Sequence, residues 1–189
     1  MLDQQSDERL MSSFINSNDI NHHRAFETLY QRHKGPMYGF ISRSLNDTEE
    51  ANEVFQEAWF KIINHKDKFD PQQKFTTWAY TIIRRLLIDY YRKQPDSGTE
   101  TQLDETLLET SADPIKQPDN EFERKQMTQQ MHQTINTLPM SQRQAFVLRH
   151  GSGFTLPEVA RITDQPQEQT KSQYRYAVKK IKLALERFK

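Results

Sequence analysis

The chain contains no cysteine among its 189 residues and only five glycines. Without cysteine it can form neither disulfides nor thiolate metal sites, which is compatible with a reducing cytoplasm. Long apolar runs are also missing. The first twenty residues carry acids and amides where a signal peptide needs a basic start and an apolar run, and no later window reaches about 18 apolar residues. We therefore expect a cytoplasmic protein that is neither exported nor membrane-spanning.

The apolar fraction of 34% is low for a chain with one compact core, since globular domains average about 45–50%. Small helical modules with much solvated surface fit this value better. The net charge is zero, but the charges are unevenly distributed. Residues 24–93 carry twelve basic and nine acidic side chains, residues 121–189 twelve and six, and residues 94–120 one lysine and seven acids. Two basic blocks joined by an acidic segment can offer two anion-binding faces in a neutral chain.

The acidic segment 94–120 also contains three prolines and a glycine, which is typical of a linker. On either side of it, apolar residues recur at helical spacing, and no segment shows the strict alternation of a strand. We predict an all-α fold of two small helical domains joined by a flexible acidic linker. The expected divisions are an N-terminal extension with a short helix at 1–23, a first domain at 24–93, the linker at 94–120 and a second domain at 121–189.

Apolar periodicity and helix-start signals place the helices along the chain. Ser141 with Gln144, and Thr155 with Glu158, both match the capping box, in which each side chain satisfies the other's free backbone donor. Pro71 disfavours helix at the residue before it, so we expect a loop at about 66–74. The predicted helices lie near 6–17, 24–45, 49–65, 74–93, 121–137, 141–151, 155–163 and 166–187. The short turn before Pro166 makes the last two a helix-turn-helix.

The final helix carries two distinct stripes. One is apolar and predicted to be buried, and comprises Tyr174, Ala177, Val178, Ile181, Leu185 and Phe188. The other is cationic and comprises Lys171, Arg175, Lys179 and Lys182. On the second helix of a helix-turn-helix, such cations can meet phosphates and guanine edges in the major groove. The alternative is a solvated basic face, but the capped partner helix and the short turn favour DNA.

The helix predicted at 74–93 has a basic and aromatic face. Projection places Trp78, Ala79, Ile82, Ile83, Leu86 and Tyr90 on the buried side, and Tyr80, Thr81, Arg84, Arg85, Tyr91 and Arg92 on the other. Rings interleaved with guanidiniums suit unpaired DNA, because bases stack on the rings while arginines hold the backbone. The alternative is a solvated surface on which Asp89 pairs with Arg85 or Lys93.

The helix predicted at 49–65 opens with acids and then presents Gln56, Glu57 and Phe60 along one side. One explanation of these acids is that negative charge in a first turn interacts favourably with the helix dipole. The other is that this side of the helix is a contact surface for another protein's helix. No catalytic set is recognisable: the six histidines lack metal-ligand spacing, and there is no glycine-rich phosphate loop. We expect no enzyme activity, no metal, no cofactor and no small-molecule substrate.

With these elements in order, residues 24–93 and 130–187 resemble the extracytoplasmic-function (ECF) group of the sigma-70 family. Region 2 of that family is resembled by AFETLYQRHKGPMYGF and KFTTWAYTIIRRLLIDYYRK, and region 4 by LPMSQRQAFVLRHGSGFTLPEVARIT and the helix after it. Members often have Gly-Ile where this chain has Asp164-Gln165 in the turn. The resemblance implies an alternative sigma factor, which directs RNA polymerase to particular promoters while the polymerase does the catalysis.

The resemblance also assigns roles to residues. Docking on core polymerase, through its β and β′ subunits, falls to Glu53, Gln56, Glu57 and Phe60. Recognition and melting of the minus-ten element fall to the loop at 66–74 and to Lys74, Trp78, Tyr80, Thr81, Arg84, Arg85, Tyr91 and Arg92. Recognition of the minus-thirty-five element falls to Lys171, Ser172, Gln173, Arg175 and Lys179. The implied partners are polymerase core, promoter DNA and an anti-sigma factor, which is often membrane-bound.

Two readings from other classes remain open at this point. A helix-turn-helix regulator that is not a polymerase subunit would use residues 121–189 in the same way. It would, however, need a ligand-sensing or dimerisation domain at 24–93, where the chain has a basic and aromatic surface instead. An adaptor protein could contain the same helices but would have no reason to align cations on two of them.

Overall fold

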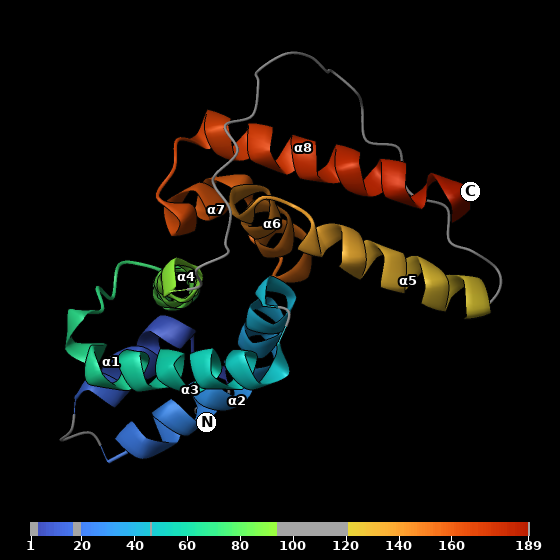
Figure 1. Cartoon of the computed structure of the whole chain (residues 1–189). Helices are drawn as coiled ribbons and strands as arrows, with labels where there is room; N and C mark the ends of the chain where they lie inside the picture. The colour runs from blue at the N-terminus through green and yellow to red at the C-terminus, as the bar shows by residue number, and fades with distance from the viewer. Residues whose placement is uncertain (1–3, 17–19, 46, 94–120, 189) are drawn as a thin grey trace.

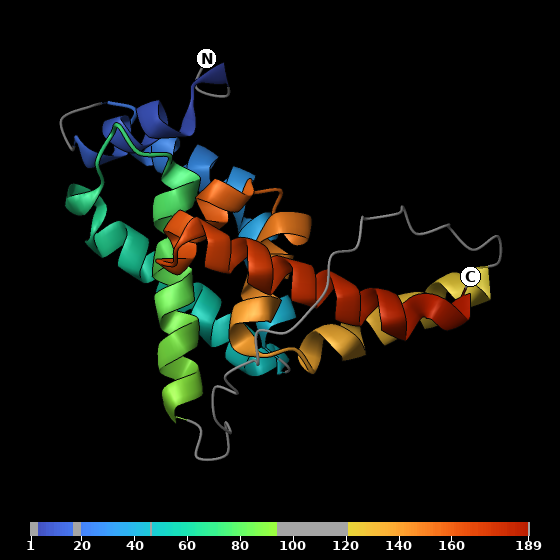
Figure 2. The same ribbon diagram turned by 90° about the horizontal axis from the view of Figure 1, so that it is seen from above.

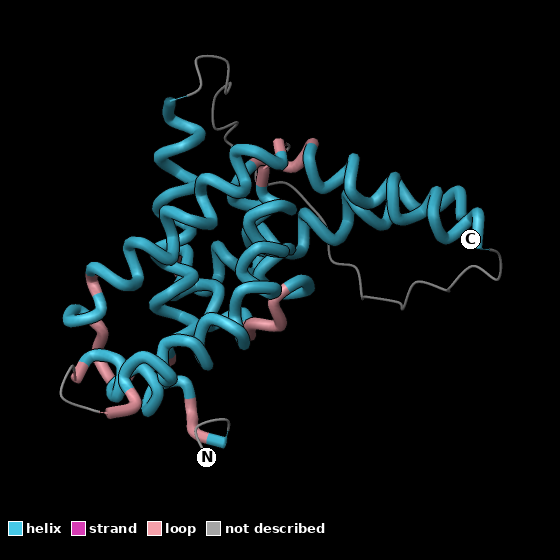
Figure 3. The backbone as a smooth tube through the Cα atoms, turned by 90° about the horizontal axis from the view of Figure 1, so that it is seen from below, coloured by secondary structure: helices cyan, strands magenta, loops and turns pink. Residues whose placement is uncertain are grey.

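The computed structural model describes residues 4–16, 20–45, 47–93 and 121–188. Every regular element in these ranges is a helix, as the tube view shows (Figure 3), so the all-α prediction is confirmed. The elements are α1 (Asp7–Ile15), α2 (His22–Ser44), α3 (Thr48–Asn64), η2 (Lys66–Lys68), α4 (Phe75–Lys93), α5 (Glu121–Asn136), α6 (Met140–Phe146), η3 (Val147–Gly151), α7 (Leu156–Thr163), α8 (Gln167–Leu185) and η4 (Glu186–Phe188). The predicted linker at 94–120 lies outside the described residues.

Helices α1 to α4 form the N-terminal half around one apolar core. Its largest fully buried side chains include Met37 and Phe40 of α2, Ile62 of α3, and Phe75 and Ile83 of α4. The start of α3 is fixed by Asp47, whose carboxylate accepts from the N–H groups of the second and third helical residues at 2.7 and 3.2 Å. The side-chain cap explains why α3 begins one residue before the predicted start.

Helices α5 to α8 form the C-terminal half, and α7 and α8 make the predicted helix-turn-helix. Thr155 and Glu158 form the predicted capping box at the start of α7. The turn between the helices is closed by Asp164, which adopts the left-handed conformation with φ 51°. This is a position that favours glycine, and an aspartate tolerates it better than most other residues. The turn therefore has the conformation typical of a helix C-terminus despite its charged residue.

The second predicted capping box is wrong. Helix α6 begins at Met140 with Pro139 at the cap position, and no side chain caps it. The Ser141 hydroxyl instead donates to Gln173 of α8 at 3.3 Å, and the Gln144 side-chain oxygen accepts from Arg84 of α4 at 3.3 Å. Both side chains therefore hydrogen-bond to other helices and cannot cap α6. The helix predicted at 141–151 is also divided, since it continues beyond Phe146 as a π-helical turn.

The two halves pack against each other. Helix α7 lies against α4, and η3 lies against the end of α2. Helices α5 and α8 run side by side and extend away from the rest of the molecule, as two perpendicular views show (Figures 1 and 2). Among the described helices, none is both long and apolar enough to cross a membrane. The packing of α7 on α4 places the first helix of the helix-turn-helix against the helix predicted to bind the minus-ten element.

Candidate nucleic-acid and protein interfaces

Helix α8 holds its cations away from the core. Ala177, Ile181 and Leu185 of the predicted apolar stripe are buried, and Tyr174 and Val178 are half-buried. On the other side Arg175 and Lys179 are exposed. The ammonium of Lys171 lies 2.6 Å from Glu168, one turn earlier, and this hydrogen bond lowers the pKa of the Glu168 carboxyl. The middle of the stripe predicted to meet duplex DNA is thus open to solvent, whereas Lys171 and Lys182 at its two ends are half-buried, and the ion pair of Lys171 is a weak surface pair.

The remaining predicted residues of this helix are less open. Ser172 is half-buried, and the side-chain oxygen of Gln173 accepts from Ser141 of α6. Gln173 is thereby held in one orientation by the neighbouring helix. A side chain fixed in this way is better preorganised to read a base than a free one, since less rotamer freedom remains to be lost.

The α4 face differs from the expectation, because the C-terminal half covers part of it. Tyr80 was projected onto the exposed side of the helix, but it is only 2% exposed. Its ring packs on Phe40 of α2 at 5.3 Å and edge-on against Phe154, which precedes α7, at 4.8 Å between centroids. Burial raises the pKa of the Tyr80 hydroxyl. The projection was wrong for this residue because it considers one helix alone and includes neither α2 nor the C-terminal half.

Two polar contacts on either side of Tyr80 also join α4 to the C-terminal half. The ammonium of Lys74, just before α4, lies 2.6 Å from the Glu158 carboxylate of α7. Further along α4, the guanidinium of Arg84 donates to Gln144 of α6 at 3.3 Å. Burial lowers the pKa of Arg84, which means that the packed arrangement removes water from a cation.

A buried arginine makes the most extensive contact between the halves. Arg143 of α6 donates to the Ser44 carbonyl at the end of α2 and to the Tyr91 hydroxyl of α4, both at 3.0 Å. It also donates to the carbonyls of Asn136 and Leu138 in its own half. The Tyr91 hydroxyl in turn donates to the Ser44 carbonyl. One side chain thus links the ends of three helices, and carbonyl oxygens supply most of its acceptors.

The other predicted residues on α4 remain more accessible. Arg85 is exposed, and Arg92 is exposed and lies 3.8 Å from Asp89 at a spacing of three residues. This pairing replaces the one predicted with Arg85 or Lys93 at a spacing of four. Trp78 is half-buried against Phe69, and the Thr81 hydroxyl donates to a carbonyl of its own helix. Four of the eight predicted residues are therefore engaged by the C-terminal half, through the contacts of Lys74, Tyr80, Arg84 and Tyr91.

Helix α3 presents the predicted protein-docking surface. Glu53, Gln56, Glu57 and Phe60 are all exposed, and Phe60 is 66% exposed despite its size. Ile63 extends this patch with 38% exposure, three residues beyond Phe60. Ile63 is not among the residues predicted for this surface, although its helical spacing from Phe60 was a signal. A large exposed aromatic and an aliphatic neighbour, rimmed by acids, are typical of a protein-binding surface.

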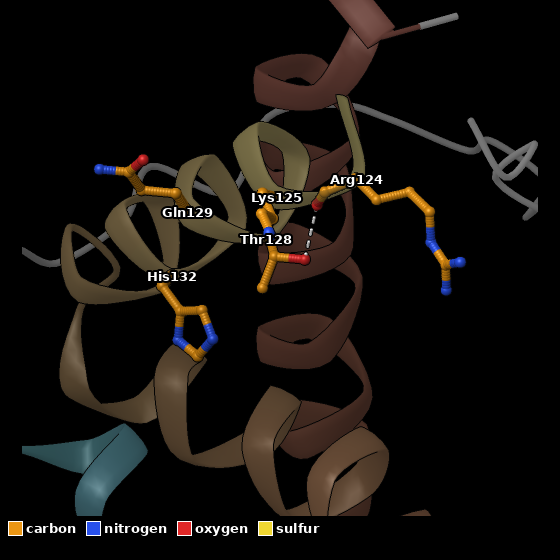
Figure 4. A pocket seen from close by; sticks show the side chains of 5 residues that line it. All are labelled: Arg124, Lys125, Thr128, Gln129 and His132. Atoms are coloured by element: carbon orange, nitrogen blue, oxygen red, sulfur yellow. Dashed lines mark hydrogen bonds between the residues drawn. The ribbon is translucent and has the colours of Figure 1, made fainter. Parts of the chain in front are cut away.

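In the described part of the chain, these surfaces are accompanied neither by a metal-binding group nor, along α5, by a convergent set of polar side chains. Those residues contain no group of three or more histidines and acids that could hold a metal ion. A hollow of about 430 Å³ lies along α5, lined by Arg124, Lys125, Thr128, Gln129 and His132. Figure 4 shows that these side chains come from a single helix and fan out in different directions. They do not converge on a common point, as the polar groups of a small-molecule site do.

The fold is that of a two-part helical protein whose C-terminal half contains a helix-turn-helix. The sigma-70 region 2 family matches residues 29–95 and the sigma-70 region 4 family matches residues 134–183, together more than half of the chain. The chain therefore belongs to the sigma-70 family, in its ECF group, and is an RNA polymerase sigma factor.

Individual relatives agree with this assignment. RNA polymerase sigma-H factor of Pseudomonas aeruginosa is 29% identical over 171 residues, covering 88% of this chain and 86% of the relative. The ECF sigma factor SigW of Bacillus subtilis is 28% identical over 75% of this chain and 79% of the relative. A solved structure of the sigma factor RpoE in complex with the anti-sigma factor NepR, from Bartonella quintana, has a TM-score of 0.66 at 19% identity and covers 86% of this chain and 98% of that one. At 19% identity, the likeness to this solved structure shows a shared fold.

Proposed function

We propose that the two halves divide the work of promoter recognition. Residues 24–93 bind core polymerase and open the minus-ten element, and residues 121–189 bind the minus-thirty-five element. The observation that carries this proposal is the separation of two exposed surfaces of opposite character: an acidic and apolar patch on α3 and a cationic stripe on α8. Catalysis belongs to the polymerase, with which the protein acts in the cytoplasm.

The α8 stripe suits recognition of a duplex. Arg175 and Lys179 are exposed on the second helix of the helix-turn-helix, and Lys171 pairs with the solvent-exposed Glu168. Contacts to phosphates give affinity, and contacts to base edges give specificity. We assign base reading to the N-terminal part of this helix, with Lys171, Ser172, Gln173 and Arg175, and phosphate binding to Lys179.

The α3 patch suits docking on a polymerase helix. Its acids attract a basic partner surface and raise the association rate. Phe60 and Ile63 supply exposed apolar surface that is buried on binding. A DNA-binding regulator outside the polymerase would have no use for this patch, nor for the basic and aromatic surface of α4. We therefore favour the polymerase subunit over that alternative.

The packed conformation has a consequence for this function. Tyr80, Arg84 and Tyr91 cannot meet unpaired DNA while Phe154, Gln144 and Arg143 contact them. The halves must therefore separate before the α4 face binds the minus-ten element. The contacts include the edge-on packing of Tyr80 against Phe154 as well as hydrogen bonds and an ion pair, and their loss must be offset by contacts to polymerase and DNA.

An anti-sigma factor is the third partner that we propose. The RpoE structure that shares this fold is a complex with the anti-sigma factor NepR. Such a partner is best placed to act here by covering the α3 patch or by keeping the halves together.

Substitutions in the α8 stripe test the DNA-binding part of the proposal. Lys171→Ala and Arg175→Ala should each weaken minus-thirty-five-dependent initiation by roughly 1–3 kcal/mol, because a contact to a base edge is lost. The measurement is transcription in vitro by reconstituted polymerase. Arg24→Ala is the matched control, since it removes an exposed cation from the N-terminal half. Unchanged promoter strength in both α8 variants would remove these residues from the DNA interface.

A charge reversal on α3 tests the docking surface. Glu57→Lys should weaken association with core polymerase, because it replaces an exposed acid beside Phe60 with a cation. The dissociation constant is measured by fluorescence anisotropy against purified core, with Glu27→Lys on α2 as the control reversal. Normal binding by Glu57→Lys, or equal loss in the control, would contradict docking through α3.

A further inference from the structure

The N-terminal helix α1 is firmly fixed to the N-terminal half, although the region 2 family match begins only at residue 29. Leu10 and Met11 are fully buried in the shared core. At the start of the helix both carboxylate oxygens of Asp7 are used, one by Arg32 and one by His33 of α2, each at 2.7 Å. The contacts with these two residues lower the pKa of Asp7 although burial opposes the shift. Helix α1 is therefore a built-in part of this domain.

From this position α1 reaches both ends of the loop that precedes α4. At the first end, the ammonium of Lys66 donates to the Phe14 carbonyl at 3.2 Å and lies 4.6 Å from the centre of the Phe14 ring. At the second end, the carboxylate of Glu8 accepts from the backbone N–H of Phe75, the first residue of α4, at 3.2 Å.

The contact from Glu8 is the more specific of the two. The first N–H groups of a helix have no partner within it, and an acid at this end also favours the helix dipole. Glu8 supplies such a partner to α4 from 67 residues away in the chain. It thus defines where α4 begins and in which direction the chain enters it.

Between these two anchors the loop has one buried side chain and a turn at Asp70, which accepts from the N–H groups of Gln72 and Gln73, each at 2.9 Å. Phe69 is buried against Phe75 and Trp78, but the five residues from Asp70 to Lys74 are all exposed. The ends of a short loop determine its path when its middle makes few contacts. While the halves are packed, the ion pair of Lys74 with Glu158 also holds the end of this loop; once they separate, its path depends on Phe69 and on the two contacts from α1.

We propose that α1 positions the promoter-opening loop at 66–74, and that Glu8 is a positioning residue for DNA melting. This inference rests on the proposed role of the loop in opening the minus-ten element. Glu8 itself touches no DNA. It acts by keeping the N-terminal end of α4, and with it Lys74 and Trp78, in the orientation that receives the unpaired strand.

The test compares two promoter templates with the same holoenzyme. One is fully paired, and the other has its minus-ten region held open by mismatches. Glu8→Ala should slow open-complex formation on the paired template by roughly three- to tenfold, the effect expected from loss of a helix cap. On the premelted template it should initiate like the wild type, because melting is no longer required. Lys66→Ala, which removes the other anchor, should behave in the same way.

Two controls separate positioning from general damage. Glu8→Gln keeps an oxygen that accepts the Phe75 N–H and should restore most of the rate, and Glu27→Ala removes an exposed acid of α2 and should change nothing. An equal defect on both templates, or no defect on the paired template, would overturn the inference. Failure of the wild-type protein to direct initiation on either template would instead overturn the proposed function.

Discussion

The ion pair between Lys74 and Glu158 allows the packing of the two halves to be tested by a single substitution. One oxygen of Glu158 lies 2.6 Å from the Lys74 ammonium, and the other accepts from the Thr155 N–H and hydroxyl at 2.9 and 2.8 Å. Glutamine also serves at this position of a capping box. Glu158→Gln therefore removes the charge that attracts Lys74 while largely preserving the start of α7.

The expected size of the effect follows from exposure. The Lys74 side chain is 66% exposed, so water and salt screen the pair even though Glu158 itself is buried. We expect a loss of about 0.5–1 kcal/mol from the packed conformation, which corresponds to a roughly two- to fivefold shift toward separated halves. The difference between wild type and variant should shrink as salt is added.

Fluorescence energy transfer measures this shift directly. The chain has no native cysteine, so Glu27→Cys and Glu186→Cys, both at exposed positions, provide one label in each half. The control is Glu168→Gln, which breaks the pair with Lys171 that has the same 2.6 Å distance but lies within α8. Lower transfer in Glu158→Gln alone supports the account. Unchanged transfer, or the same change in Glu168→Gln, would refute the reasoning.

Two further predictions concern stability. The contacts with Lys74 and Thr155 lower the pKa of Glu158 to about 2 from its ordinary 4.5, so the contribution of Glu158 to the folding free energy is complete above pH 4.5 and is lost as the pH falls toward 2. The difference in unfolding free energy between wild type and Glu158→Gln should therefore narrow over this range. A difference that stays constant in denaturation curves would contradict this prediction. Arg143→Met keeps a similar volume but removes the side-chain donor from the Leu138 carbonyl and one of the two donors to the Ser44 carbonyl, which should cost about 1–3 kcal/mol and uncouple the halves. Both tryptophans lie in the N-terminal half, so fluorescence and circular dichroism should report separate transitions in this variant, whereas exposed Arg161→Met should leave them together.

Local patterns predicted most of the helices because their causes are local. The box at Thr155 and Glu158 involves residues three apart, and the apolar stripe of α8 repeats within one helix. Local patterns gave a wrong prediction at Ser141 and Gln144, because these side chains hydrogen-bond to α8 and α4 instead of capping α6.

The contacts between the halves had no signal in the sequence. Lys74 and Glu158 are 84 residues apart, and nothing near Arg143 indicated that it would be buried against the end of α2. A helical projection also placed Tyr80 on the outer face, since it considers one helix alone. The residues that cover the predicted minus-ten surface therefore became visible only in the folded chain.

The central claim is that this protein directs polymerase to promoters. Its most direct test is run-off transcription from fragmented genomic DNA by sigma-free core polymerase, with and without the protein, followed by sequencing of the transcript starts. The account predicts starts that appear only with the protein and share two spaced upstream motifs. No new starts, together with no stable complex with core polymerase, would contradict it.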